Sequence, residues 1–266
     1  MNKLIATSIT LSTLLTSNIL ADFNFDTLPP KLTAYYQSTN QNIDTIKMKL
    51  KSHGFTILSS QPILKEKTIL TISNDELKAT NSYMATLNLL IDNKNSKIRI
   101  QNPSYLGMAY LKDYKYGQFK NTLKALEKIL GEMIPTSQQK ESSKLPKYHF
   151  MFGMPYLEDT IIVAQGDFLH KKLKSSNILY QLKLSNGSTL VGHKLSNTTN
   201  SFLKKINQEK NAQMLPYQSI IYNKKATILD PKYYLALSLP LLSMSQFMKI
   251  ASTPDDIEQE IIKAYK

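Results

Sequence analysis

The sequence predicts an α+β protein built as a tandem repeat of a strand–helix–four strands–helix unit with antiparallel sheets. Two observations lead to this prediction. Short runs of β-branched and aromatic residues alternate with turn residues, whereas the few runs with helical spacing of apolar residues end at glycine. In addition, one pattern occurs twice: a short β-rich run, then Asn or Asp, Pro, one further residue and Tyr, at residues 102–105 and 230–233.

The two occurrences belong to longer similar stretches. Residues 93–106 resemble residues 223–235, and the prolines Pro103 and Pro231 are 128 residues apart. Upstream, residues 68–74 resemble residues 189–197 at an offset of 121. Because the order is kept at a nearly constant offset, we predict two copies of one unit.

The repeat divides the chain into four parts. We expect a signal peptide at 1–21, a first repeat domain at 22–131, a linker at 132–147 and a second repeat domain at 148–266. The segment 132–147 is polar and contains prolines and serines, which is typical of a linker.

The first domain shows its elements in a clear order. The run 32–38 is apolar and aromatic and predicts a strand. Ile43, Ile46 and Leu50 have helical spacing, and Gly54 suits the helix end. Four strands and a long helix then follow: strands at 55–58, 68–72, 85–91 and 97–101, and a helix marked by Phe119, Leu123, Leu126 and Leu130 that ends at Gly131.

The second domain repeats that order. Asn186-Gly187 between two β-rich runs is a strong hairpin signal. The final helix is expected to have Thr253 as its N-cap and Pro254 in its first turn. The remaining elements are a strand at 160–164, a short helix at 168–174, strands at 178–184 and 189–194, a helix around 202–206, and strands at 217–222 and 226–229.

Composition excludes several kinds of site. The 266 residues are 42% hydrophobic, which is enough for a packed core. The absence of cysteine excludes disulfides, thiolate zinc sites, iron–sulfur clusters and cysteine nucleophiles. The formal net charge is +13, yet Arg99 is the only arginine, and nucleic-acid readers depend on arginine. We therefore do not expect a nucleic-acid partner.

The N-terminal segment predicts export. A short basic start with Lys3 precedes an uncharged apolar run, and Ala21 places a small residue before a cleavage at Asp22. Serine and threonine interrupt the run, so we favour a cleaved signal peptide over a membrane anchor. We expect an exported, periplasmic protein that does not span the membrane after cleavage.

The C-terminal copy of the pattern suggests a family. Leu215-Pro216, an apolar strand, a turn, a second strand, Asp230-Pro231 and an apolar helix start resemble the bacterial domain-of-unknown-function family 302. The first copy keeps Asn102-Pro103 but lacks the Leu-Pro. The resemblance would cover most of the chain as two divergent copies. It implies a fold similar to the TATA-binding-protein type and frequent export, and it carries over no catalytic residue.

The repeated motif has a structural explanation. Asn102 and Asp230 are good N-caps, and a proline suits the first helical turn because its missing N–H is not needed there. The alternative is a ligand site that uses Asp230, Tyr233, Asn102 and Tyr105. We favour the caps, because capping already accounts for the Asn, Asp and Pro.

A short run at residues 149–154 raises one metal hypothesis. If it is a strand, His149 and Met151 share one face, with Met154 nearby. Imidazole and thioether ligands suit Cu(I), and export fits copper handling. The alternative, that the methionines fill gaps in the core, is the one we favour, and no cofactor is predicted.

No catalytic motif accompanies these features. The sequence has no His-Glu-x-x-His helix, Gly-x-Ser-x-Gly elbow or glycine-rich phosphate loop. The leading hypothesis is a non-enzymatic exported binding or accessory protein whose partner is a small apolar ligand or an envelope protein. A periplasmic copper-binding protein and an enzyme of unrecognised type are the alternatives.

Overall fold

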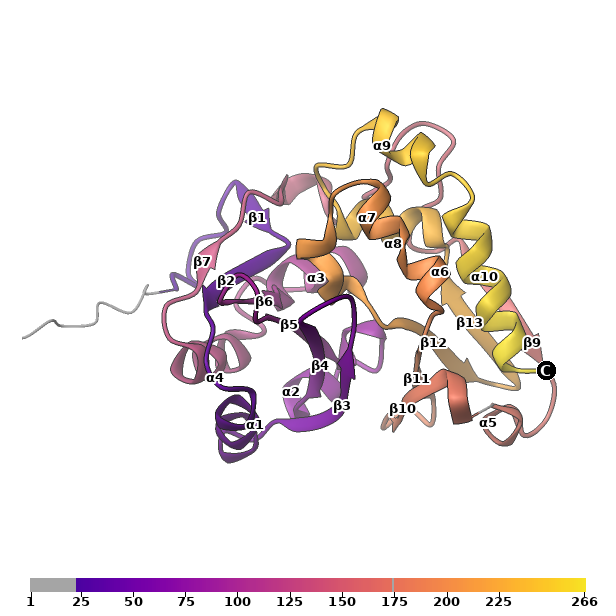
Figure 1. The fold of residues 1–266 in the computed structure, drawn as a ribbon, viewed down its shortest axis with the longest axis horizontal. Helices are drawn as coiled ribbons and strands as arrows, with labels where there is room; N and C mark the ends of the chain where they lie inside the picture. The colour runs from indigo at the N-terminus through magenta and orange to yellow at the C-terminus, as the bar shows by residue number, and fades with distance from the viewer. Residues whose placement is uncertain (1–22, 174) are drawn as a thin grey trace, which may run out of the picture.

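The computed structural model describes residues 23–173 and 175–266, so the predicted signal peptide lies outside the described residues. Helices combine with antiparallel sheets in this part of the chain, which confirms the predicted α+β class (Figure 1). We refer to residues 23–147 as the first half and to residues 148–266 as the second half.

The first half is built on a six-stranded antiparallel sheet with the strand order β3-β4-β5-β6-β2-β7. Its elements in chain order are β1 (Lys31–Thr33), β2 (Tyr35–Thr39), α1 (Ile43–Ser52), β3 (Thr56–Pro62), β4 (Lys67–Ser73), α2 (Asp75–Lys78), the 3₁₀ helix η1 (Tyr83–Ala85), β5 (Leu87–Asp92), β6 (Lys97–Gln101), α3 (Pro103–Tyr110), α4 (Lys120–Leu130), β7 (Ile134–Pro135), β8 (Gln139–Glu141) and η2 (Ser142–Lys144).

The second half is built on a five-stranded antiparallel sheet with the order β10-β11-β12-β13-β9. Its elements are β9 (Thr160–Gln165), α5 (Leu169–Lys172), η3 (Ser175–Asn177), β10 (Ile178–Lys183), β11 (Thr189–His193), α6 (Asn197–Asn200), α7 (Phe202–Lys205), η4 (Glu209–Met214), β12 (Tyr217–Tyr222), β13 (Lys225–Leu229), α8 (Pro231–Ser238), α9 (Met244–Lys249) and α10 (Thr253–Ala264).

Apart from β7, the two sheets have the same strand order. In each half, four consecutive strands lie side by side, and the strand that precedes them pairs with the last of the four. Pro103 and Pro231 each begin the helix that follows that last strand. This agreement is what two copies of one unit would give, although the duplication itself stays a prediction.

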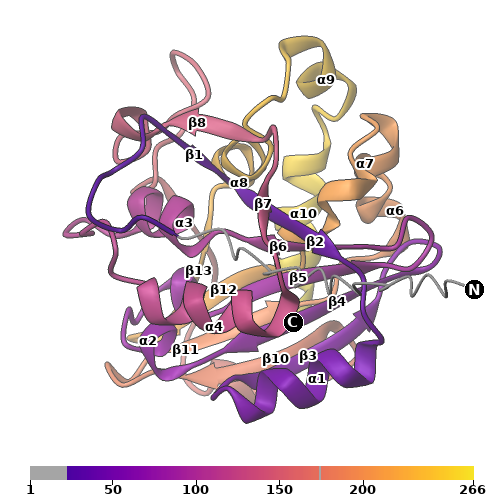
Figure 2. The same ribbon diagram turned by 90° about the vertical axis from the view of Figure 1, so that its left-hand side faces the viewer.

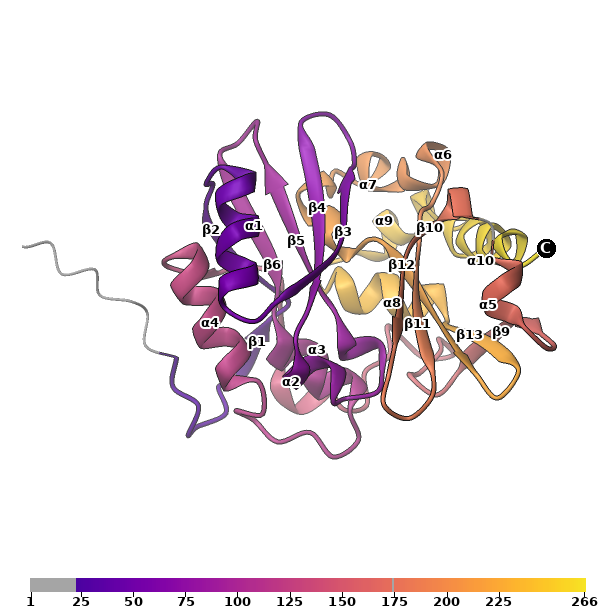
Figure 3. The same cartoon turned by 90° about the horizontal axis from the view of Figure 1, so that it is seen from below.

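One face of each sheet packs into the hydrophobic core, because apolar residues alternate with polar residues along the strands. Ile98 and Ile100 of β6 are buried, as are Ala226 and Ile228 of β13, and these are the positions expected to face inward. Helices α1 and α4 cover the outer side of the first sheet, which is clearest in Figure 2. Figure 3 shows α10 on the far side of the second sheet, so both sheets lie between the outer helices.

The two halves share one continuous hydrophobic core. The connection before β5 and the connection before β12 each cross to the opposite half: η1 lies against β12, and η4 lies against β5 and β6. The Tyr83 hydroxyl donates to the Thr227 carbonyl (3.0 Å), and Arg99 Nη1 donates to Asn211 Oδ1 (2.7 Å). Thr227 is 128 residues after Arg99, so matching positions of the two sheets receive these contacts.

The segment 132–147 differs from the predicted linker. It contains β7, which pairs with β2, and β8, which pairs with β1. Gln138, Ser142 and Leu145 are buried. Backbone pairing therefore orders this segment despite its polar sequence. Such pairing satisfies the backbone N–H and C=O groups and does not depend on apolar side chains.

Two element boundaries also differ from expectation. The strand expected at 32–38 is split at Ala34 into β1 and β2, which join different sheets. Thr253 is the first residue of α10 rather than its cap, a position taken by Ser252 without a side-chain capping bond. The second difference is of the size expected at an element end, whereas the split at Ala34 separates two strands that pair with different partners.

Candidate functional site

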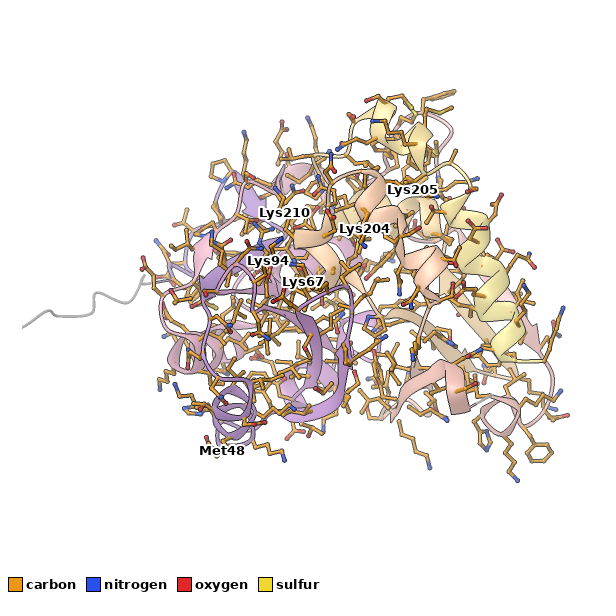
Figure 4. All side chains as sticks on the ribbon, in the orientation of Figure 1. Met48, Lys67, Lys94, Lys204, Lys205 and Lys210 are labelled. Carbon is orange, nitrogen blue, oxygen red and sulfur yellow. The ribbon has the colours of Figure 1, made fainter. Side chains whose placement is uncertain are left out.

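A groove lined by many charged residues lies where the two halves meet. It encloses about 530 Å³ and we call it the lysine groove. Figure 4 shows Lys67, Lys94, Lys204 and Lys210 gathered there. The residues that line it are Leu64, Lys65, Glu66, Lys67, Asp92, Lys94, Asn95, Lys204, Asn207, Glu209 and Lys210.

One wall of the lysine groove consists of two hairpin turns of the first sheet. The β3–β4 and β5–β6 turns lie at the same end of that sheet, and Asn93 N donates to the Glu66 carbonyl oxygen across them (3.1 Å). Asp92 organises this wall, because it accepts from Asn95 and forms an ion pair with Lys67. Burial alone would raise the pKa of Asp92, but the bonds from Lys67 and Asn95 outweigh it and lower that pKa.

The other wall comes from the second half. Lys204 lies in the last turn of α7, and Lys210 lies in η4. Arg99 of β6 holds η4 in place through Asn211 Oδ1 and, at 3.5 Å, the Lys210 carbonyl oxygen. The only arginine of the chain therefore has a structural task at the boundary of the groove.

Four of the groove lysines are exposed and lack an ion-pair partner. Among the described residues, Lys65, Lys94, Lys204 and Lys210 make no salt bridge within 4.0 Å. Glu66 and Glu209 are the remaining acids of the groove, so the four lysines leave an excess of positive charge. A groove with such an excess attracts anions.

A second pocket, of about 340 Å³, lies between β11 and α10 and is lined in part by His193. His193 Nε2 is 2.7 Å from Ser219 Oγ, which is 2.6 Å from the Tyr265 hydroxyl oxygen. Burial lowers the pKa of His193 to about 3, so the ring is neutral at physiological pH. No sequence pattern indicates that these three residues meet, because they lie on separate elements.

The His193–Ser219 contact has the residue types of a nucleophile and its base. Ser219 is 0% exposed in the middle of β12, however, so no substrate can reach its hydroxyl. His193 Nδ1, where a serine hydrolase needs an acid, has no hydrogen-bond partner among the described residues, and Tyr265 bonds to Ser219 instead. We therefore interpret the three residues as a buried hydrogen-bond network of the fold.

The structure places the two cap residues of the repeated motif, Asn102 and Asp230, at helix starts. It places the two tyrosines of the motif at the interface between the halves. Asn102 Oδ1 accepts from Ser104 N (2.9 Å) and Asp230 Oδ1 accepts from Lys232 N (2.7 Å), so both side chains cap a helix. Tyr105 and Tyr233 are buried, at 0% and 1% exposure. Both hydroxyls bond to the opposite half, and Tyr233 also lines a small pocket of about 190 Å³ together with Tyr148 and Tyr156.

The expected strand at 149–154 is a turn. The backbone N of Met154 donates to the Met151 carbonyl oxygen, and His149 Nδ1 lies 2.9 Å from that same oxygen. The alternation that would place His149 and Met151 on one strand face is therefore absent. Within residues 23–173 and 175–266, no three His, Asp or Glu side chains come together as a metal site, and copper binding stays a hypothesis.

Comparison with known protein families, with curated proteins and with solved structures gives no match. Along the described part of the chain, no helix combines the length and the apolar character that a bilayer crossing requires. The interpretation of this protein therefore depends on its own geometry.

Proposed function

We propose that this protein is an exported, non-enzymatic binding protein that holds a multiply charged anion in the lysine groove. The observation that carries the proposal is the set of four exposed, unpaired lysines that come from both halves and surround one groove. The proposed anion replaces the small apolar ligand expected from the sequence, because the lining of this groove is charged.

Electrostatics explains why such a groove favours an anion. Like charges at the rim repel one another, and folding brings Lys94 and Lys210 to the same groove although they are far apart in the sequence. An anion among the lysines replaces that repulsion with attraction. The gain is screened by salt, so binding should weaken as ionic strength rises.

The type of side chain limits the class of ligand. Lysine acts as a compact point charge, whereas arginine offers a planar fork that selects one anion geometry. The groove lining contains lysine and no arginine. We therefore propose low selectivity among phosphate- and carboxylate-rich anions, with charge as the main determinant.

Export and family membership belong to the same proposal. The basic start, apolar run and small residue at the N-terminus support secretion to the periplasm. The Asp-Pro pattern and the order of the strands support a relationship to the domain-of-unknown-function family 302, present as two divergent copies. A binding or accessory role is consistent with a buried Ser219 that substrates cannot reach.

Calorimetric titration with pyrophosphate tests the groove. We expect binding that weakens with added salt and that falls about tenfold in the double variant Lys94→Gln/Lys210→Gln, because two exposed charge contacts of ~0.5–1 kcal/mol are lost. The control is Lys112→Gln/Lys115→Gln, which removes the same charge from exposed lysines outside the groove lining. Equal losses in both variants, or no heat of binding, would refute the proposal.

A further inference from the structure

Three segments that are distant in the sequence meet at one end of the molecule. The Phe150 and Phe247 rings are 5.3 Å apart, which joins the loop 147–157 to α9. Gln246 Nε2 donates to the Ile206 carbonyl oxygen (3.2 Å), which joins α9 to the end of α7. We call the surface formed by residues 147–157, 202–208 and 241–252 the α9 face. Figure 1 shows α9 protruding at this end, with α7 beside it.

The α9 face is unusually apolar for an exposed surface. Twelve large hydrophobic side chains of the described residues are exposed, and six of them belong to this face. Phe152 is fully exposed at the tip of its loop, and Met244 and Met248 lie one turn apart on α9. The other three are Met151, Tyr156 and Leu241. Exposed apolar side chains that gather in this way mark an interaction surface.

The charges of the α9 face all have one sign. Its three segments contain four exposed lysines and no aspartate or glutamate: Lys147, Lys204, Lys205 and Lys249. Acidic residues border these segments at Glu158, Asp159 and Glu209, and Asp159 Oδ2 accepts from Tyr156 N (2.8 Å), so the positive charge is concentrated on the segments themselves. Figure 4 shows Lys204 and Lys205 together near the top of the molecule. The partner should therefore be apolar at its surface and negatively charged.

We infer that the α9 face docks on the surface of an anionic lipid bilayer. Phe152 and the two methionines of α9 enter the headgroup level, and the lysines lie beside lipid phosphates. An apolar tip with basic side chains around it is how peripheral proteins bind such surfaces. The apolar side chains lie on a protruding loop and helix rather than in a groove, which suits a bilayer better than a single protein segment.

Vesicle flotation tests this inference on protein purified from the cell envelope, after its N-terminus has been sequenced. We expect flotation with vesicles of phosphatidylglycerol and phosphatidylcholine, and little with phosphatidylcholine alone. The variant Phe152→Ser/Met248→Gln should bind at least about tenfold more weakly, because two apolar side chains no longer enter the lipid. The lysine variant Lys205→Gln/Lys249→Gln, whose residues lie outside the lysine groove, should lose about tenfold or more, since each lysine near an anionic surface contributes ~1 kcal/mol.

Matched controls separate this face from the rest of the surface. Phe168→Ser/Met48→Gln changes exposed side chains of the same kind elsewhere, and it should bind as the wild type does. Met48 lies at the opposite end of the molecule in Figure 4. Lys94→Gln/Lys210→Gln should retain vesicle binding within about twofold, so a failure of the lysine groove is distinguishable from a failure of the α9 face.

Three outcomes would overturn the inference. The first is no flotation with anionic vesicles. The second is an equal loss in the control variants, which would indicate general charge or stickiness. The third is a concentration-dependent dimer in light scattering that Phe152→Ser/Met248→Gln abolishes without changing flotation, which would assign the face to a second copy of the chain.

Discussion

Tyr105 and Tyr233 hold matching positions in the two halves, and each donates its hydroxyl to the helix of the other half. Tyr105 bonds to the Leu237 carbonyl oxygen at 2.8 Å, and Tyr233 bonds to the Ala109 carbonyl oxygen at 3.4 Å. Both the donors and the acceptors are 128 residues apart. The interface therefore has the reciprocal form of a twofold dimer contact within one chain.

This reciprocity predicts a measurable stability cost. Tyr105→Phe leaves the buried Leu237 carbonyl oxygen without the hydrogen bond from the Tyr105 hydroxyl. The free energy of unfolding should therefore fall by about 1–3 kcal/mol. Tyr233→Phe should cost less, because its bond is at the long end of the hydrogen-bond range. Urea unfolding measures both, with the exposed Tyr222→Phe as the control. A larger loss in Tyr233→Phe than in Tyr105→Phe would contradict the geometry.

The helix caps give a second prediction. Asp230→Ala should lower the free energy of unfolding by about 1 kcal/mol, because Lys232 N loses its acceptor. Asn102→Ala should cost more, since Asn102 is buried and its amide also donates to the Thr33 carbonyl oxygen (2.8 Å). Asp230→Asn keeps a capping oxygen and should be nearly neutral in thermal unfolding. A loss of stability in Asp230→Asn as large as in Asp230→Ala would contradict the capping role.

Much of the fold could be predicted because local signals and tertiary structure agree in the repeated unit. Pro103 and Pro231 begin helices after the last strand of each sheet, and the Asn186-Gly187 turn joins β10 and β11. Ile98 and Ile100, which alternate with Lys97, Arg99 and Gln101 in the sequence, are buried in the core. These signals act over a few residues, so a sequence can reveal them.

The rest depends on contacts between distant residues. Nothing in the polar segment 132–147 shows that β7 and β8 find partners 100 residues upstream, because backbone pairing needs no apolar pattern. The lysine groove likewise exists only because η4 crosses to the first sheet. Met151 and Phe152 looked like strand residues, yet the hydrogen bond from Met154 N closes a turn there.

A third prediction concerns the decrease in the free energy of unfolding at acidic pH. The neutral His193 of the folded state takes up no proton until about pH 3, whereas in the unfolded chain it does so below about pH 6.5. Protons therefore favour the unfolded state between these values, and stability is complete above pH 6.5 and falls as pH decreases. The slope should be about 1.4 kcal/mol per pH unit at most.

His193→Gln removes this titration while keeping a group that can bond to Ser219 Oγ. Urea unfolding between pH 4.5 and 6.5 should show a steeper dependence in the wild type than in the variant. This window lies above the usual pKa of Asp92, whose lowered pKa makes its own contribution disappear only in stronger acid. Equal slopes in the two proteins would show that His193 takes up protons equally in the folded and unfolded states, so that burial does not lower its pKa.

The last prediction concerns the boundary between the halves, where sequence and structure disagree. The polar segment 132–147 would be the first site of proteolysis if it were a linker. In the structure Thr136 N donates to the Tyr35 carbonyl oxygen (3.1 Å), and Ser142 N donates to the Pro30 carbonyl oxygen (2.9 Å). A protease needs exposed backbone that can adopt an extended form, so we expect this segment to resist cleavage.

The loop that follows is the better substrate. Phe152 is fully exposed in the loop 147–157, so brief treatment with chymotrypsin should cut after Phe152 first, as mass spectrometry of the fragments will show. Phe168 is also exposed but its carbonyl accepts from Lys171 N (2.8 Å) at the start of α5, and it should be cut later. Phe152→Ser should slow the first cut without moving it into 132–147. Early cleavage within 132–147 would restore two independent domains, whereas resistance there agrees with the single core that both halves share.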